Sequence, residues 1–598
     1  MNDGQPLDLA LIGNCRVAAL IDSSARVVWW CFPRFDGDPV FCRLLSGSEE
    51  KGFTDVVLHD QVKTTSSYAR NTAVLETFLE DEHGAIVKIT DFMPRFGRYE
   101  RVFRPPQFVR RIEPVAGLPR IALRVRPAFN YGGKPAQVVI GSNHIRYVGD
   151  RDVLRLSTDA PLSFIAGETM FALTRPLTLI FGVDEPFLSE IDSTARDFET
   201  RTLVYWREWV RTLGVPFEWQ GEVIRAAITL KLCSFEETGA IIAAHTTSIP
   251  EAPGTMRNWD YRFCWLRDAF FVVAALNRLG ATQTMESYIN YLTTVVADPD
   301  GVLSPLHSIV PGAPLDERLA ENLEGFGGQG PVRIGNAAAE QAQHDGYGSV
   351  VLGAKQMFVD HRLPKMGDEA LFRRLEPLGE RAAKLALTPD AGIWEYRGRT
   401  RVHTYSATLC WAACDRLSQI AGYLCLPDRS AYWRDRASVI RRAILEGAWS
   451  EKRGAIVGAF GHDDLDASVL MIADLGLLPP TDPRFVMTVA AIGRELKRNG
   501  RIMRYTAADD FGEPETAFIV CNFWYADALA AIGKREQARE VFQDILSHSN
   551  KYGLLSEDIH PKTGQLWGNI PQTYSMAGVI NSAMHLSNRW EDAWWRGW

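Results

Sequence analysis

The sequence predicts an antiparallel β-sandwich over residues 1–188, a helical linker over 189–216 and an (α/α)6 barrel over 217–598. Two observations lead to this prediction. Apolar residues alternate with polar ones up to about residue 185 and recur at helical spacing beyond residue 215. Long and short connections then alternate between the expected helices, which is typical of helical hairpins closed into a ring.

The N-terminal part shows the period of two that half-buried strands produce, with frequent turn residues between them. Clear examples are IALRVRPAFNY, HIRYVGDRDVLRLSTDAPLSF and LTLIFGV, which begin at residues 121, 144 and 177. Short strands separated by turn signals are the pattern of a sandwich. Residues 191–213 then carry Leu and aromatic side chains at helical spacing, so we expect a connecting helix there.

The C-terminal part contains twelve segments with helical periodicity. They span residues 222–237, 265–280, 283–296, 337–358, 368–387, 404–423, 428–448, 463–475, 483–495, 515–532, 535–549 and 573–588. Antiparallel neighbours joined alternately by long and short connections carry all the long loops at one end, where they should surround one pocket. The six long loops span residues 238–264, 297–336, 388–403, 449–462, 496–514 and 550–572.

Composition and charge exclude several classes of protein. With 46% hydrophobic and 23% charged residues, the chain is predicted to be globular. Its net charge of -8 and scattered basic residues argue against a nucleic-acid partner. No apolar run is long enough for a membrane span, and the start lacks a basic secretory region, so we expect a cytoplasmic protein. The nine cysteines form no CxxC pair, which favours free buried thiols.

Two glutamates on different long loops could together hydrolyse a glycosidic bond. That reaction needs one carboxyl group to protonate the leaving oxygen and a second to activate water, and it requires no metal or other cofactor. Glu395 stands between Trp394 and Tyr396, apolar neighbours that would raise its pKa and suit a proton donor. Glu557 lies in a polar turn beside Asp558 and should stay ionised, as a base requires. Each glutamate alone would more often be a surface residue, but the pair favours catalysis.

The first long loop carries the mixture of aromatic and charged side chains that is typical of a sugar-binding site. In RNWDYRFCWLRDA, which begins at residue 257, Trp265, Arg267 and Asp268 lie at the start of an expected helix. Carboxylate and guanidinium groups hydrogen-bond sugar hydroxyls, while a ring stacks on the apolar face of the sugar. For Arg262 in the same segment, a surface ion pair is the preferred interpretation.

Four segments together resemble glycoside hydrolase family 15, the family of glucoamylases and bacterial trehalases. They are RNWDYRFCWLRDA, PVRIGNAAAEQ (331–341), GIWEYRG (392–398) and GLLSEDIHPKTGQLWGNIPQTYS (553–575). The segment LIGNCRVAALIDSSARVVWWCFPRFDGDPVF, from residue 11, is similar to the N-terminal β-domain of the bacterial members. The similarity covers almost the full chain, with the motifs in the same order.

The resemblance implies an inverting, exo-acting α-glucoside hydrolase that releases β-glucose, with Glu395 as general acid and Glu557 as general base. The residues expected to bind the terminal glucose are Tyr261, Trp265, Arg267 and Asp268. We extend this expectation to further residues of the same motifs, namely Arg333, Asn336, Trp394, Arg397 and Trp567. The expected partner is a small-molecule or oligosaccharide α-glucoside, either trehalose or the end of an α-1,4 or α-1,6 glucan.

Two departures from the family pattern leave the substrate open. Met576 stands where the family usually has His, and HDGYG (344–348) replaces LDVYG. The alternatives are an inverting disaccharide phosphorylase, which would not need a carboxylate at Glu557, and a catalytically silent sugar-binding protein. The turn WCFPRFDGDPVF, from residue 30, either reaches over the pocket or forms a buried corner of the sandwich. The aromatic tail RWEDAWWRGW, from residue 589, would allow association into a homo-oligomer.

Overall fold

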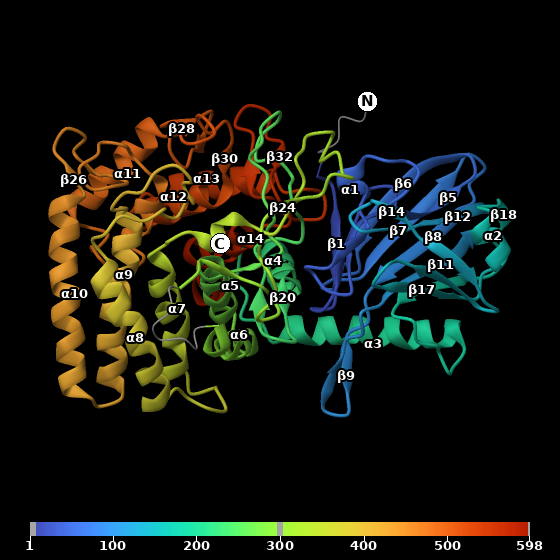
Figure 1. Cartoon of the computed structure of the whole chain (residues 1–598), viewed down its shortest axis with the longest axis horizontal. Helices are drawn as coiled ribbons and strands as arrows, with labels where there is room; N and C mark the ends of the chain where they lie inside the picture. The colour runs from blue at the N-terminus through green and yellow to red at the C-terminus, as the bar shows by residue number, and fades with distance from the viewer. Residues whose placement is uncertain (1–6, 296–302, 596–598) are drawn as a thin grey trace.

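A computed structural model describes residues 7–295 and 303–595. Strands fill the N-terminal part, one long helix follows, and helices form the C-terminal part (Figure 1), so the predicted fold class is confirmed. The connecting helix α3 spans Ile191–Arg211 and begins after β19, Leu177–Gly182. It is followed by α4, Gln220–Leu232. The predicted boundaries after residues 188 and 216 fall in the gaps beside α3; as limits of separate domains they stay predictions.

The β-domain consists mainly of two antiparallel sheets. In the first, the order is β1-β2-β3-β5-β12-β18, with β4 paired to β3. Its strands are β1 Ala10–Gly13, β2 Ala18–Ile21, β3 Val27–Phe32, β4 Asp38–Phe41, β5 Phe53–Leu58, β12 Arg120–Arg126 and β18 Phe171–Ala172. In the second, the order is β15-β16-β17-β19-β11-β8-β7-β6. Its other strands are β6 Gln61–Tyr68, β7 Leu75–Asp81, β8 Ile86–Phe92, β11 Phe108–Ala116, β15 Gln137–Ile140, β16 His144–Val148 and β17 Val153–Thr158.

Strand β3 lies between the sandwich and the helical part, and all six of its residues are buried. The indole N–H of Trp29 donates a hydrogen bond of 2.8 Å to the carbonyl oxygen of His245. In the turn after β3, the ring of Phe35 packs edge-on against His245, with centroids 4.8 Å apart. This turn is therefore a buried corner of the sandwich, and it does not line the pocket described below.

Arg262 lies at the same junction and corrects a prediction. It pairs with Asp260 at 2.7 Å, but both side chains are fully buried, so the expected surface ion pair is wrong. The guanidinium group also donates to the carbonyl oxygen of Gly37 and to the hydroxyl of Tyr131, each at 3.0 Å. These acceptors from the β-domain satisfy the remaining hydrogen-bond donors of the buried guanidinium group, as a buried ion pair requires.

Inner and outer helices alternate along the chain in the barrel. The inner ring contains α5 Leu266–Arg278, α7 Asp345–Lys355, α9 Thr404–Tyr423, the 3-10 helix η3 Ala467–Ile472, α12 Ile519–Ala531 and α14 Thr573–Leu586. The outer ring contains α4, α6 Thr282–Val295, α8 Glu369–Leu385, α10 Pro427–Gly447, α11 Pro483–Glu495 and α13 Arg535–Ser547. Each inner member contacts the next, and α14 contacts both α12 and α5, which closes the ring. The expected long loops carry the short strands at the upper end of the barrel in Figure 1.

Two predicted helices differ from the structure. The expected helix at 463–475 is only the short η3, where the carboxylate of Asp466 accepts a hydrogen bond from the backbone N–H of Ser468 at 2.8 Å. The expected helix at 337–358 is interrupted between the 3-10 helix η1, Ala337–Glu340, and α7. In the interruption, the side chain of Gln341 donates to the carbonyl oxygen of Glu395 at 3.1 Å. The Asp466 bond is an N-cap that sets the start of η3 at residue 467, whereas the Gln341 bond is a tertiary contact with another loop.

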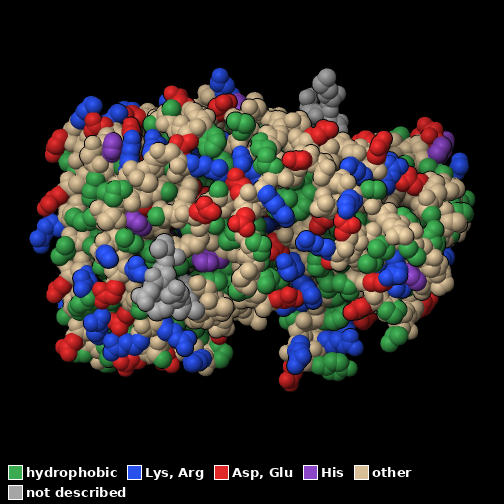
Figure 2. All heavy atoms as spheres, viewed as in Figure 1, with side chains coloured by type: hydrophobic (Ala, Val, Ile, Leu, Met, Phe, Trp, Pro, Cys, Tyr) green, Lys and Arg blue, Asp and Glu red, His purple; other side chains and the backbone are tan. Residues whose placement is uncertain are grey.

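Most of the cysteines are buried, and the C-terminal tail packs against the rest of the chain. All nine cysteines are free, and only Cys425 is exposed. In the part of the chain that the structure describes, no helix combines the length and apolar character needed to cross a bilayer. On the face shown in Figure 2, basic and acidic side chains are interspersed. The tail begins with α15, Trp590–Trp595, and packs on its own chain, since the Trp590 ring meets Phe217 at 5.1 Å; residues 596–598 lie outside the described part.

Candidate active site

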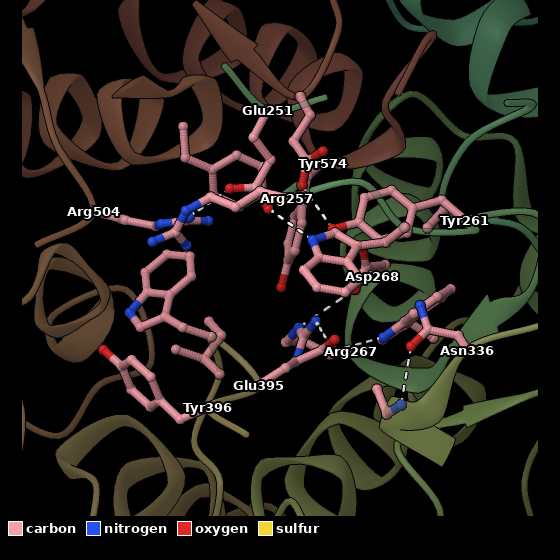
Figure 3. A pocket seen from close by; sticks show the side chains of 18 of the residues that line it. Glu251, Arg257, Tyr261, Arg267, Asp268, Asn336, Glu395, Tyr396, Arg504 and Tyr574 are labelled. Atoms are coloured by element: carbon pink, nitrogen blue, oxygen red, sulfur yellow. Dashed lines mark hydrogen bonds and ion pairs between the residues drawn. The ribbon is translucent and has the colours of Figure 1, made fainter. Parts of the chain in front are cut away.

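One pocket lies among the long loops at the upper end of the barrel and encloses about 800 Å³, including its open mouth. Most of the site residues that the sequence predicted line this pocket, namely Tyr261, Trp265, Arg267, Asp268, Asn336, Trp394, Glu395, Arg397 and Glu557. Side chains from distant loops thus meet around one space, and Figure 3 shows Glu395 beside Arg267, with Glu251 and Arg504 across the opening. The roles assigned to these residues stay predictions, but the structure places them together.

Glu395 is held by the start of helix α5. Its Oε1 accepts a hydrogen bond from the indole N–H of Trp265 at 2.7 Å and lies 3.3 Å from Nη2 of Arg267. The indole N–H of the neighbouring Trp394 donates a hydrogen bond of 2.7 Å to the carboxylate of Asp466. The carboxylate of Glu395 therefore contacts a cation and an indole N–H in addition to its aromatic neighbours in the chain, and its role as proton donor stays a prediction. The backbone of Glu395 adopts φ +60°, a strained conformation for a residue other than glycine and one that often marks a functional site.

Glu557 has the more enclosed carboxylate. The residue is 2% exposed and directly precedes β31, Asp558–Ile559. This strand pairs with β30, Ala517–Phe518, on one side and with β32, Leu566–Trp567, on the other. Its Oε1 accepts a hydrogen bond of 2.7 Å from the hydroxyl of Tyr261, whereas its buried Oε2 has no hydrogen-bond partner among the described residues. Burial raises the pKa of Glu557 well above its ordinary value, and Glu251 and Asp558 raise it further. The expectation of a polar turn in which Glu557 ionises readily is wrong.

The floor of the pocket is formed by the first turn of α5. Arg267 Nε lies 3.4 Å from Asp268 Oδ2, and Arg267 Nη1 donates to Gln343 at 3.1 Å. Burial raises the pKa of Asp268 to about 7, although Arg267 opposes this effect. Asp268 Oδ2 and the hydroxyl of Tyr574 are buried and without hydrogen-bond partners among the described residues. Such groups in a pocket are available to the hydroxyls of a ligand.

Asn336 reaches the pocket wall, but its side chain is engaged in local structure. The Oδ1 atom of Asn336 caps η1 by accepting a hydrogen bond from Ala338 N at 2.9 Å, and its Nδ2 donates to the carbonyl oxygen of Asp260. Met576, the departure from the family pattern, lies on α14 behind the loop of Glu557. The Leu555 amide donates to its sulfur at 3.4 Å, so this position supports the loop through a soft acceptor.

Two of the predicted substrate-binding residues do not line the pocket. Arg333 donates to the carbonyl oxygen of Asn258 at 2.9 Å and pairs with Glu317 at 2.7 Å, outside the pocket wall. Trp567 lies on β32, Leu566–Trp567, where it is buried and its ring faces Phe326 with centroids 6.1 Å apart. Both predictions are corrected, since neighbouring loops occupy these side chains.

The structure also adds residues that the sequence did not single out. Glu251 lines the pocket, and its carboxylate pairs with Arg504 at 2.5 Å and accepts the indole N–H of Trp259 at 3.0 Å. Tyr574 also lines the pocket, with the guanidinium group of Arg267 5.9 Å from its ring centroid. Glu251 and Arg504 lie on the first and fifth predicted long loops, so loop position alone could have marked them as pocket residues. Neither belongs to a recognisable short motif.

Potential metal ligands cluster elsewhere. In the described ranges, the single group with suitable spacing is Asp60, Glu82 and His83, on exposed turns of the β-domain. The carboxylates of the pocket do not form such a group, and their contacts with Tyr261, Trp265 and Arg267 suit hydrogen bonding to a sugar.

Known proteins resemble the chain over nearly its whole length. The sequence profile of glycosyl hydrolases family 15 matches residues 220–584, and that of the trehalase-like N-terminal domain matches residues 3–164. A trehalase from Thermoplasma volcanium is 31% identical, over 96% of this chain and 92% of its own. A trehalase from Mycolicibacterium smegmatis is 30% identical, over 98% of this chain and 92% of its own.

The fold has a solved counterpart as well. The crystal structure of a bacterial glucoamylase complexed with acarbose gives a TM-score of 0.68, with 13% identity, and the match covers 96% of this chain and 94% of the glucoamylase. Together with the two matching profiles and the full-length relatives, this confirms the family that the sequence motifs indicated. The chain belongs to glycosyl hydrolase family 15 and is a glycosidase.

Proposed function

We propose that this glycosidase is a trehalase that hydrolyses α,α-trehalose with inversion at the anomeric carbon. Support comes from the trehalases of Thermoplasma volcanium and Mycolicibacterium smegmatis, which align over nearly the full length of both chains. The likeness to glucoamylase, at 13% identity, concerns the fold alone. The observation that carries the proposal is the meeting of Glu395 and Glu557, from two different loops, in one pocket with a charged floor.

In the proposed complex, the terminal glucose lies on the floor of the pocket. Asp268 accepts hydrogen bonds from sugar hydroxyls and Arg267 donates to them. Because Arg267 is already held by Gln343 and Asp268, little reorganisation is needed when the sugar binds. The leaving glucose then lies toward the mouth.

The reaction requires one proton to enter the leaving group and one to leave water. Glu395 donates its proton to the glycosidic oxygen while water attacks the anomeric carbon from the opposite face. The old C–O bond breaks as the new one forms, and Glu557 takes the proton that water loses. The hydroxyl of Tyr261 fixes Oε1 of Glu557, so the unpartnered Oε2 is the oxygen that accepts from water.

Glu557 must be ionised to accept this proton. Burial raises its pKa, as do Glu251 and Asp558, whereas the hydroxyl of Tyr261 and the guanidinium group of Arg504 lower it. The net direction is upward. We therefore expect the acid limb of the pH profile of kcat/KM to lie above the ordinary range of a glutamate.

Kinetics with three disaccharides test the proposal. Purified protein is mixed separately with trehalose, maltose and isomaltose, with and without inorganic phosphate, and free glucose and glucose 1-phosphate are measured. We expect glucose from trehalose at a rate independent of phosphate. A strict phosphate requirement would indicate the phosphorylase alternative, and hydrolysis of maltose but not trehalose would assign a glucoamylase-type activity instead. The cytoplasmic location and the homo-oligomer stay predictions.

A further inference from the structure

The pocket changes from buried to exposed between its floor and its mouth. Arg267 and Asp268 on the floor are buried, whereas Asp510 and Phe511 at the rim are exposed. A glucose ring held on the floor therefore directs its leaving group toward the rim. The residues around the mouth decide how large that leaving group can be.

Glu317 ties two loops together beside this mouth. Its Oε1 pairs with Arg333 Nη1 at 2.7 Å, and its Oε2 pairs with Arg397 Nη2 at 3.1 Å. The side chains of Glu317 and Arg333 are each 14% exposed. Burial alone would raise the pKa of Glu317, but the backbone N–H of Ala337 and the two guanidinium groups outweigh it and lower the pKa. We call Glu317, Arg333 and Arg397 the clasp.

The clasp fixes an aromatic wall of the pocket. The guanidinium groups of Arg397 and Arg333 lie 4.4 and 5.0 Å from the centroid of the Trp259 ring. The N–H of Trp259 is fixed by Glu251, and its ring meets Phe511 edge-on at 5.4 Å. Moving this indole outward would therefore disrupt two cation–π contacts as well as a hydrogen bond.

A second set of bonds connects the clasp to the opposite rim. The backbone N–H of Arg397 donates to Asp510 at 2.7 Å. Arg257, from the first long loop, pairs with Asp509 and also donates to the carbonyl oxygen of Gly512 at 2.8 Å. Four loops, 238–264, 297–336, 388–403 and 496–514, are thus joined around the mouth by polar contacts, of which those of Arg257 and Arg333 are partly buried and those of Arg397 are exposed.

We infer that the clasp sets the size limit of the leaving group and restricts hydrolysis to disaccharides. A third sugar would have to extend past Trp259 and Arg397, and room for it requires that the pairs of Glu317 be broken. Glu317 and Arg333 do not line the pocket, so they act as positioning residues through Trp259 and Arg397. This inference rests on the proposed hydrolysis of an α-glucoside and names the residues that limit substrate length.

The test compares elongated substrates with disaccharides. Trehalose is paired with trehalose that carries one additional α-1,4-linked glucose, and maltose is paired with maltotriose; kcat/KM is measured for each. The variant Glu317→Gln keeps the shape of the side chain but removes its charge. We expect the ratio of elongated to disaccharide substrate to rise at least about tenfold in Glu317→Gln, since one blocking contact contributes a factor of this order.

Two variants control the comparison. Glu321→Gln changes an exposed glutamate of the same loop and should leave the ratio at its wild-type value. Arg333→Gln opens the clasp from the other side and decides the question if Glu317→Gln does not fold. An unchanged ratio in the folded clasp variant overturns the inference, as does a wild-type enzyme that cleaves elongated and short substrates equally well. If trehalose is not cleaved but maltose is, the proposed trehalase activity fails while the maltotriose ratio still tests the clasp.

Discussion

Glu395 and Glu557 line the same pocket, but their surroundings differ. The carboxylate of Glu395 is partly exposed and contacts Arg267 and the indole N–H of Trp265. The carboxylate of Glu557 is buried near Glu251 and Asp558, and Tyr261 is its hydrogen-bond partner. The proposed acid thus lies beside a cation and the proposed base among other acids, whereas the flanking residues predicted an apolar setting for the acid and a polar turn for the base. The comparison teaches that the charge state of the proposed base depends on the acidic residues around it.

Replacing Glu557 should produce the largest effect. We expect Glu557→Gln to lower kcat by about 10²–10⁴-fold, the usual contribution of a general base, while KM changes little. Steady-state kinetics with trehalose check this expectation. The matched control is Glu513→Gln, on the exposed rim loop, which should retain wild-type activity. Nearly full activity of Glu557→Gln would remove this residue from the mechanism.

Replacing Glu395 should have an effect that depends on the leaving group. We expect Glu395→Gln to be severely impaired on trehalose but much less impaired on α-glucosyl fluoride, because fluoride departs without protonation. Glu557→Gln should be impaired on both substrates, so the two variants separate the roles of acid and base. Equal loss of activity of Glu395→Gln on both substrates would contradict its assignment as proton donor.

The hydrogen bond of Tyr261 to Glu557 should matter less than either glutamate. Its loss in Tyr261→Phe should lower kcat/KM by about ten- to a hundredfold, the range for a hydrogen bond to a charged group. The hydroxyl lowers the pKa of Glu557, so its removal raises that pKa. Because the base must be ionised, the acid limb of the pH profile should move to higher pH. A limb that stays in place would exclude this coupling.

Asp558 provides the smallest but most specific change. Burial raises its pKa to about 8, with Glu251 adding to the effect, and Asp558 in turn raises the pKa of Glu557. Asp558→Asn should therefore move the acid limb of kcat/KM to lower pH with little loss at the plateau. A shift to higher pH, or none, would show that Asp558 does not control the charge of Glu557.

The same substitution has a consequence for stability. An aspartate in an unfolded chain has an ordinary pKa of 3.8, whereas the pKa of Asp558 in the folded protein is about 8. Between these values the folded state binds more protons than the unfolded state, so the contribution of Asp558 to the free energy of unfolding falls as pH rises through this window. Thermal unfolding is measured at several pH values between these two pKa values. As the pH rises, the free energy of unfolding should fall less for Asp558→Asn than for wild type. An identical pH dependence would contradict the raised pKa.

The architecture could be predicted from the sequence because local periodicity determines it. The expected helix 404–423 matches α9, and helix 483–495 matches α11, since each has a continuous apolar pattern. The helix at 463–475 was not predicted correctly, because a single capping side chain, Asp466, changes the backbone at its start. The burial of Arg262 against the β-domain could not be predicted either, because its contact with Gly37 joins segments more than two hundred residues apart.

The pocket was predictable in outline only. Loop lengths and motifs brought Glu395 and Glu557 to one rim, whereas the pKa of Glu557 also depends on the charges of Glu251 and Arg504, which come from other loops. Trp567 was expected to bind the sugar because it belongs to one of the family motifs, but its ring packs edge-on against Phe326. Charge state and side-chain engagement arise from long-range contacts, so single-sequence patterns do not contain them.

The anomeric configuration of the first products tests the central claim most directly. Proton NMR of trehalose hydrolysis, recorded before mutarotation, distinguishes α-glucose from β-glucose. Inversion by Glu395 and Glu557 predicts equal initial amounts, because the attacked ring becomes β-glucose and the leaving ring departs as α-glucose. If only α-glucose appeared at first, the anomeric carbon would have retained its configuration, and the assignment of Glu557 as a base acting on water would be contradicted.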